Sequence, residues 1–361
     1  MMDKSLNITN GPRQSNFELL RILAMLFVLV VHSDFSSLGA PDRLDFINAP
    51  EESISKTIFE ALSIGCVNLF ILISGWFGIR PSVKGFFNFI FQCAYYMIGI
   101  YLLSLIIGKA HFSITGVLEC LALTSSNWFI KAYIGLYILS PILNSFARSA
   151  TLKQHCVVLI AFYIFQTIFG ITNAAQFIDF GYSTFSFIGL YLLANLLRRI
   201  ISEPEKCAIK IRLLSFEMGG VIYLLSALCC AVTYYIFAKR EISLQVFNYI
   251  NPFVVIGSAA LLILFSSVKI KHSKIINFIS ASSFAVYLLH TNPNIFSPFF
   301  KPTIKAITES SSGIITLIEI FAFLIALFII AIVLDQPRKF LWRKLARMID
   351  VRFSDIKTIN N

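Results

Sequence analysis

The sequence has little charge for its length. Of its 361 residues, 14% are charged and 57% are hydrophobic, whereas a soluble domain is about a quarter charged and about half apolar. This composition excludes an ordinary soluble protein. Apolar runs of about 17–25 residues, the length that crosses a bilayer as an α-helix, recur from one end of the chain to the other. The sequence therefore predicts an all-α integral membrane protein.

Several common sequence signatures are also missing. No P-loop, G-x-G-x-x-G, H-E-x-x-H or G-x-S-x-G motif occurs in a supporting context. The seven cysteines show no metal-ligand spacing, so we interpret them as small buried apolar residues and expect no bound metal. The net charge of +11 does not indicate nucleic acid as a partner, because the basic residues lie between apolar runs. The first apolar run is too long for a cleavable signal peptide and lacks a cleavage site.

About ten transmembrane helices are expected, of which the fifth and sixth are short enough to be tilted or partly re-entrant. Outside these spans, 21 Lys and Arg residues fall on the side that carries both termini and 7 fall on the other side. Basic residues favour the cytoplasmic side, so both termini are predicted to be cytoplasmic. The expected spans are 17–37, 57–79, 86–108, 127–147, 155–171, 183–198, 217–238, 251–268, 275–292 and 314–335.

The chain is then expected to comprise three parts. A cytoplasmic N-terminal segment (1–16) precedes a transmembrane domain (17–335), which a basic cytoplasmic tail (336–361) follows. Within the tail, RKFLWRKLARMIDVRF (338–353) is typical of an amphipathic helix on the inner membrane surface. No loop is long enough for a soluble domain, and the sequence shows no internal repeat.

The first expected span, NFELLRILAMLFVLVVHS (16–33), keeps three ionisable side chains in an apolar run. Arg21 and His32 share one helix face at about 100° per residue and lie roughly 16 Å apart along the axis. Glu18 precedes Arg21 by one turn and is placed to pair with it. A charge within a span costs about 3 kcal/mol and normally faces a polar interior. The alternatives are that Arg21 extends to the inner interface and that His32 only forms a packing hydrogen bond.

Two later spans carry further polar candidates. His290 ends the ninth span at a depth comparable to that of His32, although an interfacial position explains it equally well. The fourth span begins with Asn127 and Trp128, and Trp128 occupies an ordinary aromatic-belt position. Lys131 lies one turn deeper and either extends outward or supplies positive charge near the histidines. Asn144, at the other end of this span, is a weaker candidate.

The second span ends in ISGWFGIRPSVK (73–84). Ser74 and the glycine after it predict a close helix approach or a local break. Arg80 and Lys84 follow at the inner face, where they could form a basic mouth with Arg21 that suits a phosphate-bearing ligand. Ordinary flanking charge of the positive-inside kind is the simpler interpretation of Arg80 and Lys84 alone.

These segments together resemble the membrane-bound acyltransferase family 3, the polytopic O-acyltransferases of bacterial surface glycans. The similar features appear in family order across about 320 residues. One departure is that the R-x-x-R run of many members is replaced here by Arg80 and Lys84. The matching features are Arg21-x10-His32 after E-L-L-R, LFILISGWF (69–77), WFIKAYIGLYILSPIL (128–143), S-x-x-x-Y-L-L-H ending at His290, and L-D-Q-P-R (334–338).

The resemblance implies an enzyme of the bacterial cytoplasmic (inner) membrane, surrounded by membrane lipids. It would move an acyl group, usually from acetyl-CoA, to a hydroxyl of a surface polysaccharide or its lipid-linked precursor. His32 would act as general base or carry the acyl group transiently, and Arg21, held by Glu18, would orient the thioester or bind CoA. The remaining candidates fall into two groups: His290, Lys131, Trp128, Asn127 and Ser74 for substrate, and Arg80 and Lys84 for the CoA phosphates.

Two other functions fit a polytopic chain with intramembrane charges. A transporter or flippase of glycan precursors would also carry such charges and basic inner loops. The lack of repeat-like halves argues against it. A glycan polymerase would be expected to have a large outer loop, which the sequence does not contain. Neither alternative would depend on CoA.

Overall fold

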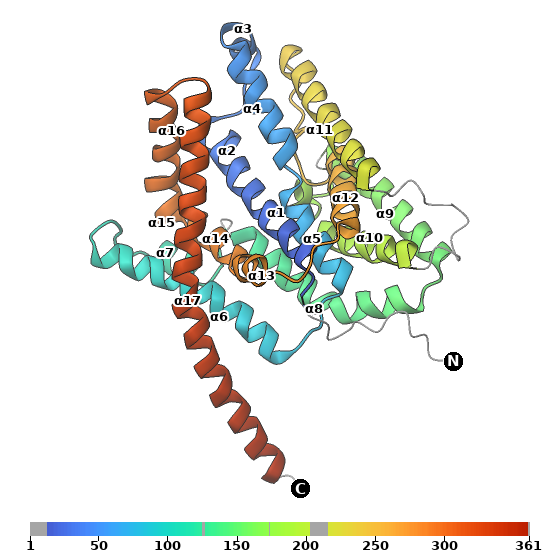
Figure 1. The fold of residues 1–361 in the computed structure, drawn as a ribbon, viewed down its shortest axis with the longest axis vertical. Coiled ribbons are helices and arrows are strands. Elements are labelled where there is room, and N and C mark those ends of the chain that lie inside the picture. Colours follow the sequence, from blue (N-terminus) through green and yellow to red (C-terminus); the bar gives the residue numbers. More distant parts are fainter. Residues whose placement is uncertain (1–12, 125–126, 173, 203–215, 360–361) are drawn as a thin grey trace. The chain divides into compact units, whose positions relative to one another are not determined.

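The computed structural model describes residues 13–124, 127–172, 174–202 and 216–359, and all regular secondary structure within these ranges is helical (Figure 1). The predicted all-α class is therefore confirmed. The chain divides into two compact units. The first comprises residues 1–80 and 128–280, and the second comprises residues 81–127 and 281–361.

The first unit contains most of the helices. The first helix, α1, packs against α4, α5, α12 and α13, while α10 packs against α5 and α8. The described elements of this unit are α1 (Ser15–Ser33), α2 (Phe35–Leu38), α3 (Arg43–Asn48), α4 (Pro50–Ser63), α5 (Cys66–Phe77), α8 (Trp128–Ser149), α9 (Leu152–Ile171), the 3-10 helix η3 (Asp179–Gly181), α10 (Thr184–Ser202), α11 (Phe216–Lys239), α12 (Pro252–Ser267) and α13 (Lys274–Ser280).

The second unit is organised around a long helix, α17, which packs against α6, α14 and α16. Its described elements are α6 (Val83–Ile106), α7 (Ile114–Cys120), α14 (Ser283–His290), α15 (Pro293–Ile295), the π-helix η5 (Phe296–Phe300), α16 (Lys301–Ser310) and α17 (Ile314–Ile359).

Eight described segments are long and apolar enough to cross a membrane. They correspond to the first seven expected spans and the tenth, and the fifth and sixth have 20 and 19 residues, which is long enough to cross at about 1.5 Å per residue. The eighth expected span is α12, an apolar helix of 16 residues. The prediction of one continuous helix over 275–292 is wrong, because α13 ends at Ser280 and α14 begins at Ser283. The total number of spans and the side of the termini stay predictions.

The basic tail continues the last helix. The predicted helix over 338–353 is present as part of α17, which runs unbroken from Ile314 to Ile359 with Pro337 inside it (Figure 1). Its location on the inner membrane surface stays a prediction. Proline lacks one backbone donor and usually kinks a helix. Here Asp335, just before it, pairs with Arg338 at 2.8 Å and with Lys339 at 3.1 Å. These ion pairs connect the turns on both sides of the proline and favour continuation of the helix.

Glycine allows the closest helix contact in the first unit. An added Cβ at Gly75 would lie 2.4 Å from the backbone oxygen of Tyr191, so α5 and α10 meet backbone to backbone there. The predicted close approach at Ser74-Gly75 is confirmed. The helix then ends at Gly78, whose φ of +75° is the left-handed conformation that terminates many helices.

Candidate functional site

The first unit assembles a buried ion pair on α1. Glu18 is buried, and its Oε2 accepts a hydrogen bond from Nη1 of Arg21 at 2.6 Å. The predicted one-turn pairing is therefore present. The hydroxyl of Ser280, at the end of α13, donates to the same oxygen, and Arg13 contributes a weaker contact at 3.9 Å. A buried carboxylate needs such donors, because burying an unpaired charge is costly.

The position of α13 against α1 is fixed by further hydrogen bonds near this pair. The hydroxyl of Ser15 donates to Oδ1 of Asn277 at 3.2 Å and accepts from the backbone N–H of Ser273 at 2.8 Å. Asn16 donates to the carbonyl of Phe265 at 2.9 Å. The start of α1 is thus tied to α12 and α13, which places Ser280 over Glu18.

A tyrosine from α8 adds a hydroxyl to this end of α1. Tyr133 is hydrogen-bonded to Ser74 on α5 and lies within electrostatic range of Arg21. Ser74 in turn donates to the carbonyl of Phe70 at 2.9 Å. The predicted residues Arg21 and Ser74 are therefore brought together, and Tyr133 joins them. This arrangement offers a cation and two hydroxyls to a polar ligand between α1, α5 and α8.

The end of α5 is held at the same end of the unit. Phe17 on α1 packs its ring 5.3 Å from Trp76 and 5.0 Å from Phe77. Arg80, exposed, follows α5 by three residues. The basic residue Arg80 therefore lies at the Arg21 end of α1.

Three side chains from α8 and α10 fasten the segment between α5 and Arg80. The Tyr191 hydroxyl accepts from the N–H of Ile79 at 2.8 Å and donates to Oδ1 of Asn144 at 2.6 Å. Asn144 donates back to the carbonyl of Ile79 at 2.8 Å. Arg198 donates to the carbonyl of Trp76 at 2.9 Å, which satisfies one of the carbonyls left open at the end of a helix. The loop that carries Arg80 is thereby given a fixed starting point.

His32 lies at the opposite end of α1. The helix is unbroken from Ser15 to Ser33, so Arg21 and His32 keep the common face and the separation of roughly 16 Å that eleven residues give. The residue is half-buried, and its backbone carbonyl accepts from the hydroxyl of Ser37 at 2.6 Å. The chain turns directly after it, at Asp34, and continues into α2.

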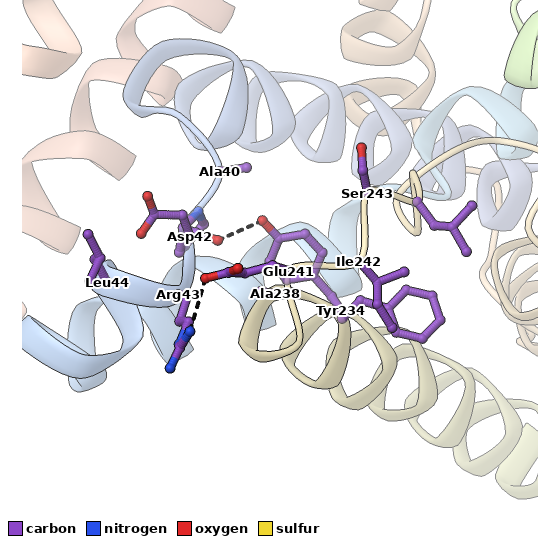
Figure 2. Close-up of a pocket in the computed structure, with 12 residues that line it drawn as sticks. Ala40, Asp42, Arg43, Leu44, Tyr234, Ala238, Glu241, Ile242 and Ser243 are labelled. Carbon is purple, nitrogen blue, oxygen red and sulfur yellow. Dashed lines mark hydrogen bonds and ion pairs between the residues drawn. The ribbon is translucent and has the colours of Figure 1, made fainter.

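A pocket of about 380 Å³ is lined by residues that follow His32 in the sequence and by residues of α11 (Figure 2). The loop after α2, the start of α3 and the end of α11 line it, with the ring of Tyr234 among apolar side chains. Figure 2 shows Arg43 and Glu241 pointing toward one another, and their ion pair measures 3.0 Å. The Tyr234 hydroxyl donates to the carbonyl of Pro41 at 2.8 Å. Carboxylate, guanidinium and aromatic groups together suit a ligand rich in hydroxyls.

The candidates at the start of α8 have separate surroundings. Trp128 is half-buried, with its ring centroid 4.5 Å from Tyr182 and 5.8 Å from Tyr249, so it belongs to an aromatic cluster. Burial raises the pKa of Tyr182, and its phenol stays a neutral hydrogen-bond donor. Lys131 is exposed. Neither Trp128 nor Lys131 is shown to join the Glu18–Arg21 pair.

Three predicted residues belong to the second unit. Lys84, on α6, is exposed. Asn127 is buried, and its amide donates to the carbonyl of Glu119 at 3.3 Å. His290 is fully buried at the end of α14, where Nδ1 donates to the carbonyl of Val286 at 2.6 Å and the ring lies 5.6 Å from Phe300. Each of these printed contacts is within the second unit.

The second unit also buries a charged cluster in the L-D-Q-P-R segment. Asp335 is fully buried, and its two oxygens accept from Arg338 at 2.8 and 3.1 Å. Lys339 donates to the hydroxyl of Ser282 at 2.7 Å, and Arg338 donates to Asn88 at 3.4 Å. The cluster connects α17 to α6 and to the segment before α14. We interpret it as the polar contact that holds these helices together.

Sequence reasoning missed several of these groups. Tyr133 and Tyr191 stand in apolar helical runs, where a tyrosine is unremarkable until its hydroxyl partner is known. Asp34 and Glu60, which are both buried, could have been found, because an acidic residue within or beside a span is rare enough to be examined.

Comparison with known proteins gives one match. The model of acyltransferase family 3, described as an acyltransferase domain, matches residues 14–336. This range contains α1 to α16 and most of the apolar part of α17. No curated protein and no solved structure matches the chain.

Proposed function

The chain belongs to acyltransferase family 3 and is a multi-pass membrane acyltransferase, and on that premise we propose that it moves an acetyl group from cytoplasmic acetyl-CoA to a hydroxyl of a surface glycan or its lipid-linked precursor. The observation that carries the proposal is the unbroken helix α1. It presents a half-buried, paired arginine near one end and a histidine near the other. We place the protein in the inner membrane of a bacterium, with the Arg21 end of α1 toward the cytoplasm.

The donor binds at the Arg21 end. Arg21 is oriented by Glu18 and faces Tyr133, and Arg80 lies beyond the end of α5. Guanidinium groups suit the phosphates of CoA because they donate several hydrogen bonds in a fixed plane. Lys84, on the second unit, stays a candidate for the CoA phosphates from the sequence alone. The pantetheine arm is long enough to carry the thioester along α1 toward His32.

The chemistry takes place at His32. An imidazole is neutral over much of the physiological range and can take a proton from a hydroxyl. As the acceptor oxygen forms its bond to the acyl carbon, its proton passes to His32 and the bond from that carbon to sulfur breaks. His32 therefore acts on the acceptor hydroxyl as general base.

The acceptor approaches from the His32 end. The pocket beyond α2 offers Arg43, Glu241 and the ring of Tyr234, which are groups that hydrogen-bond sugar hydroxyls and pack on sugar rings (Figure 2). We place the outer sugar units of the acceptor there. Trp128, Lys131, Asn127 and His290 stay candidates for further acceptor contacts.

The test is CoA-dependent transfer. Membranes that contain the full chain receive acetyl-CoA labelled in the acetyl group together with the host glycan, and membranes without the protein serve as control. We expect label in the glycan fraction, and we expect an excess of unlabelled acetyl-CoA to remove it. Absence of label, combined with movement of glycan precursor across the membrane, would instead support a flippase.

A further inference from the structure

A buried layer of polar side chains begins directly after His32. It lies between the α1–α2 junction and α4, two regions that pack against each other. All of its members are less than a tenth exposed, which is unusual in a chain with so little polar content. We call this layer the polar seam. Its members are Ser33, Asp34, Ser37, Ser53, Thr57 and Glu60.

Three hydroxyls of the polar seam donate to backbone carbonyls and not to its acids. Ser33 donates to the carbonyl of Val30 at 2.9 Å, and Thr57 donates to the carbonyl of Ser53 at 2.7 Å. Ser37 donates to the carbonyl of His32. These three hydroxyl protons are therefore already used by backbone oxygens.

The two acids each keep one unsatisfied oxygen. Asp34 is 7% exposed and Glu60 is 3% exposed, and Oδ2 of the first and Oε2 of the second have no hydrogen-bond partner. Glu60 accepts from the backbone N–H of Phe35, the residue next to Asp34, and lies within electrostatic range of the Asp34 carboxyl. Buried polar atoms nearly always have partners. Two unpartnered carboxyl oxygens at one position need a physical explanation.

The charged groups around Asp34 and Glu60 do not explain the two unpartnered oxygens. Lys56, one turn before Glu60 on α4, lies within electrostatic range of Asp34, but its ammonium is 2.8 Å from the exposed Glu52. Three groups from other elements interact electrostatically with the acids: Tyr234 on α11, Cys66 on α5 and Tyr182 before α10. Asp42, at the start of α3, and Asp45 on α3 interact electrostatically with Tyr234. None of these is a second cation. Two buried like charges with at most one nearby cation are strongly unfavourable.

We propose that Asp34 and Glu60 hold one proton between them and exchange protons with His32. The shared proton gives the two oxygens a donor, which removes the mutual repulsion. His32 is two residues from Asp34, so their Cα atoms lie within about 7 Å of each other. Both acids act through His32 and not on the substrate, so they are positioning residues.

The inference rests on the proposed function and assigns the pair a step within it. The acceptor O–H bond breaks and its proton passes to the His32 ring as the C–O bond forms and the thioester C–S bond breaks. The pair takes this proton from His32, which frees the ring, and then returns it through His32 to the departing CoA thiolate. The hydroxyl proton thus ends on the thiol, and no other reactant is needed.

Infrared spectroscopy of the purified full chain tests the shared proton without any substrate. A protonated carboxyl has a carbonyl stretch that an ionised carboxylate lacks, and the band shifts in heavy water. We expect the band at neutral pH in the wild type, and we expect both Glu60→Gln and Asp34→Asn to lose it, because the remaining carboxyl no longer faces a second one. Glu51→Gln, which replaces an exposed acid on α4, is the matched control and keeps it. Absence of the band in the wild type, or its persistence in both variants, overturns the proposal.

Acyl transfer supplies the second readout. With each single variant kept at normal protein level, we expect turnover to fall about 10-fold, with an altered pH profile and an unchanged KM for the donor. Glu51→Gln should keep the wild-type profile. A fall in turnover with an unchanged pH profile indicates a structural role and overturns the relay. If the infrared band behaves as expected but no acyl transfer occurs, the proposed function fails and the proton-holding pair stands.

Discussion

The Arg21 guanidinium donates to the Glu18 carboxylate at 2.6 Å, one turn away on α1. Because Ser280 donates to the same oxygen, Glu18 also connects α1 to α13. The pair therefore has two consequences: it orients the arginine, and it fixes a contact between two helices that are far apart in the sequence.

Glu18→Gln is expected to reduce both stability and donor binding. The change keeps the size of the side chain but removes the charge that holds Arg21, and hydrogen bonds to charged groups contribute about 2 kcal/mol. We expect a lower free energy of unfolding and a KM for the acyl donor that rises about 10-fold. Glu52→Gln, which breaks only the ion pair with Lys56, is the control. Equal KM values for the two variants would contradict the role assigned to Glu18.

Gly75→Ala is expected to destabilise the first unit. The new Cβ would lie 2.4 Å from the Tyr191 carbonyl oxygen, and forcing extra volume into a packed contact costs about 1–3 kcal/mol. Gly99→Ala on α6 is the matched control, because an added Cβ there meets nothing within 4 Å and alanine favours a helix more than glycine does. Thermal unfolding of the purified variants compares them. An equal melting temperature for both would show that α5 and α10 do not approach as described.

Tyr191→Phe tests the anchoring of the segment before Arg80. Loss of the hydroxyl leaves the buried N–H of Ile79 without its partner and removes the hydrogen bond that Oδ1 of Asn144 accepts. The expected cost is about 1–3 kcal/mol. We expect the KM for acetyl-CoA to rise while kcat changes little, because Arg80 is then less well placed. Steady-state kinetics with varied donor separate the two parameters. A fall in kcat alone would contradict this placement of the donor.

Arg43→Ala tests the acceptor pocket of Figure 2. The Arg43–Glu241 pair is exposed, so its loss should change stability by less than about 1 kcal/mol. The KM for the glycan acceptor should nevertheless rise by about 10-fold if one hydrogen bond from a charged donor is lost. Lys305→Ala, an exposed cation on α16, is the control. An unchanged acceptor KM would move the acceptor away from this pocket.

Local features of this site were accessible from the sequence. The Glu18–Arg21 pair and the common face of Arg21 and His32 follow from helix periodicity alone, and both survive because α1 is unbroken. The close approach at Gly75 follows from the absence of a side chain. The first two depend on residues within a few turns of one another, whereas the sequence did not identify α10 as the partner of Gly75.

Features that depend on distant segments were not accessible. Ser280 reaches Glu18 across 262 residues of sequence, and Tyr133 on α8 comes within electrostatic range of Arg21 on α1 only through the packing of helices that are distant in the sequence. The break between α13 and α14 falls at Ala281-Ser282, within a run that is apolar enough to suggest one helix. Hydropathy does not distinguish a turn satisfied by neighbouring polar groups from a continuous helix.

The most direct test of the central claim is acetyl transfer by His32→Ala, compared with His111→Ala, which replaces an exposed histidine outside the spans. Both variants are brought to the wild-type protein level in membranes, and label from acetyl-CoA is measured in the glycan. A general base contributes about 100-fold or more, so His32→Ala should lose transfer to that extent while His111→Ala keeps it. Normal transfer by His32→Ala would contradict the account.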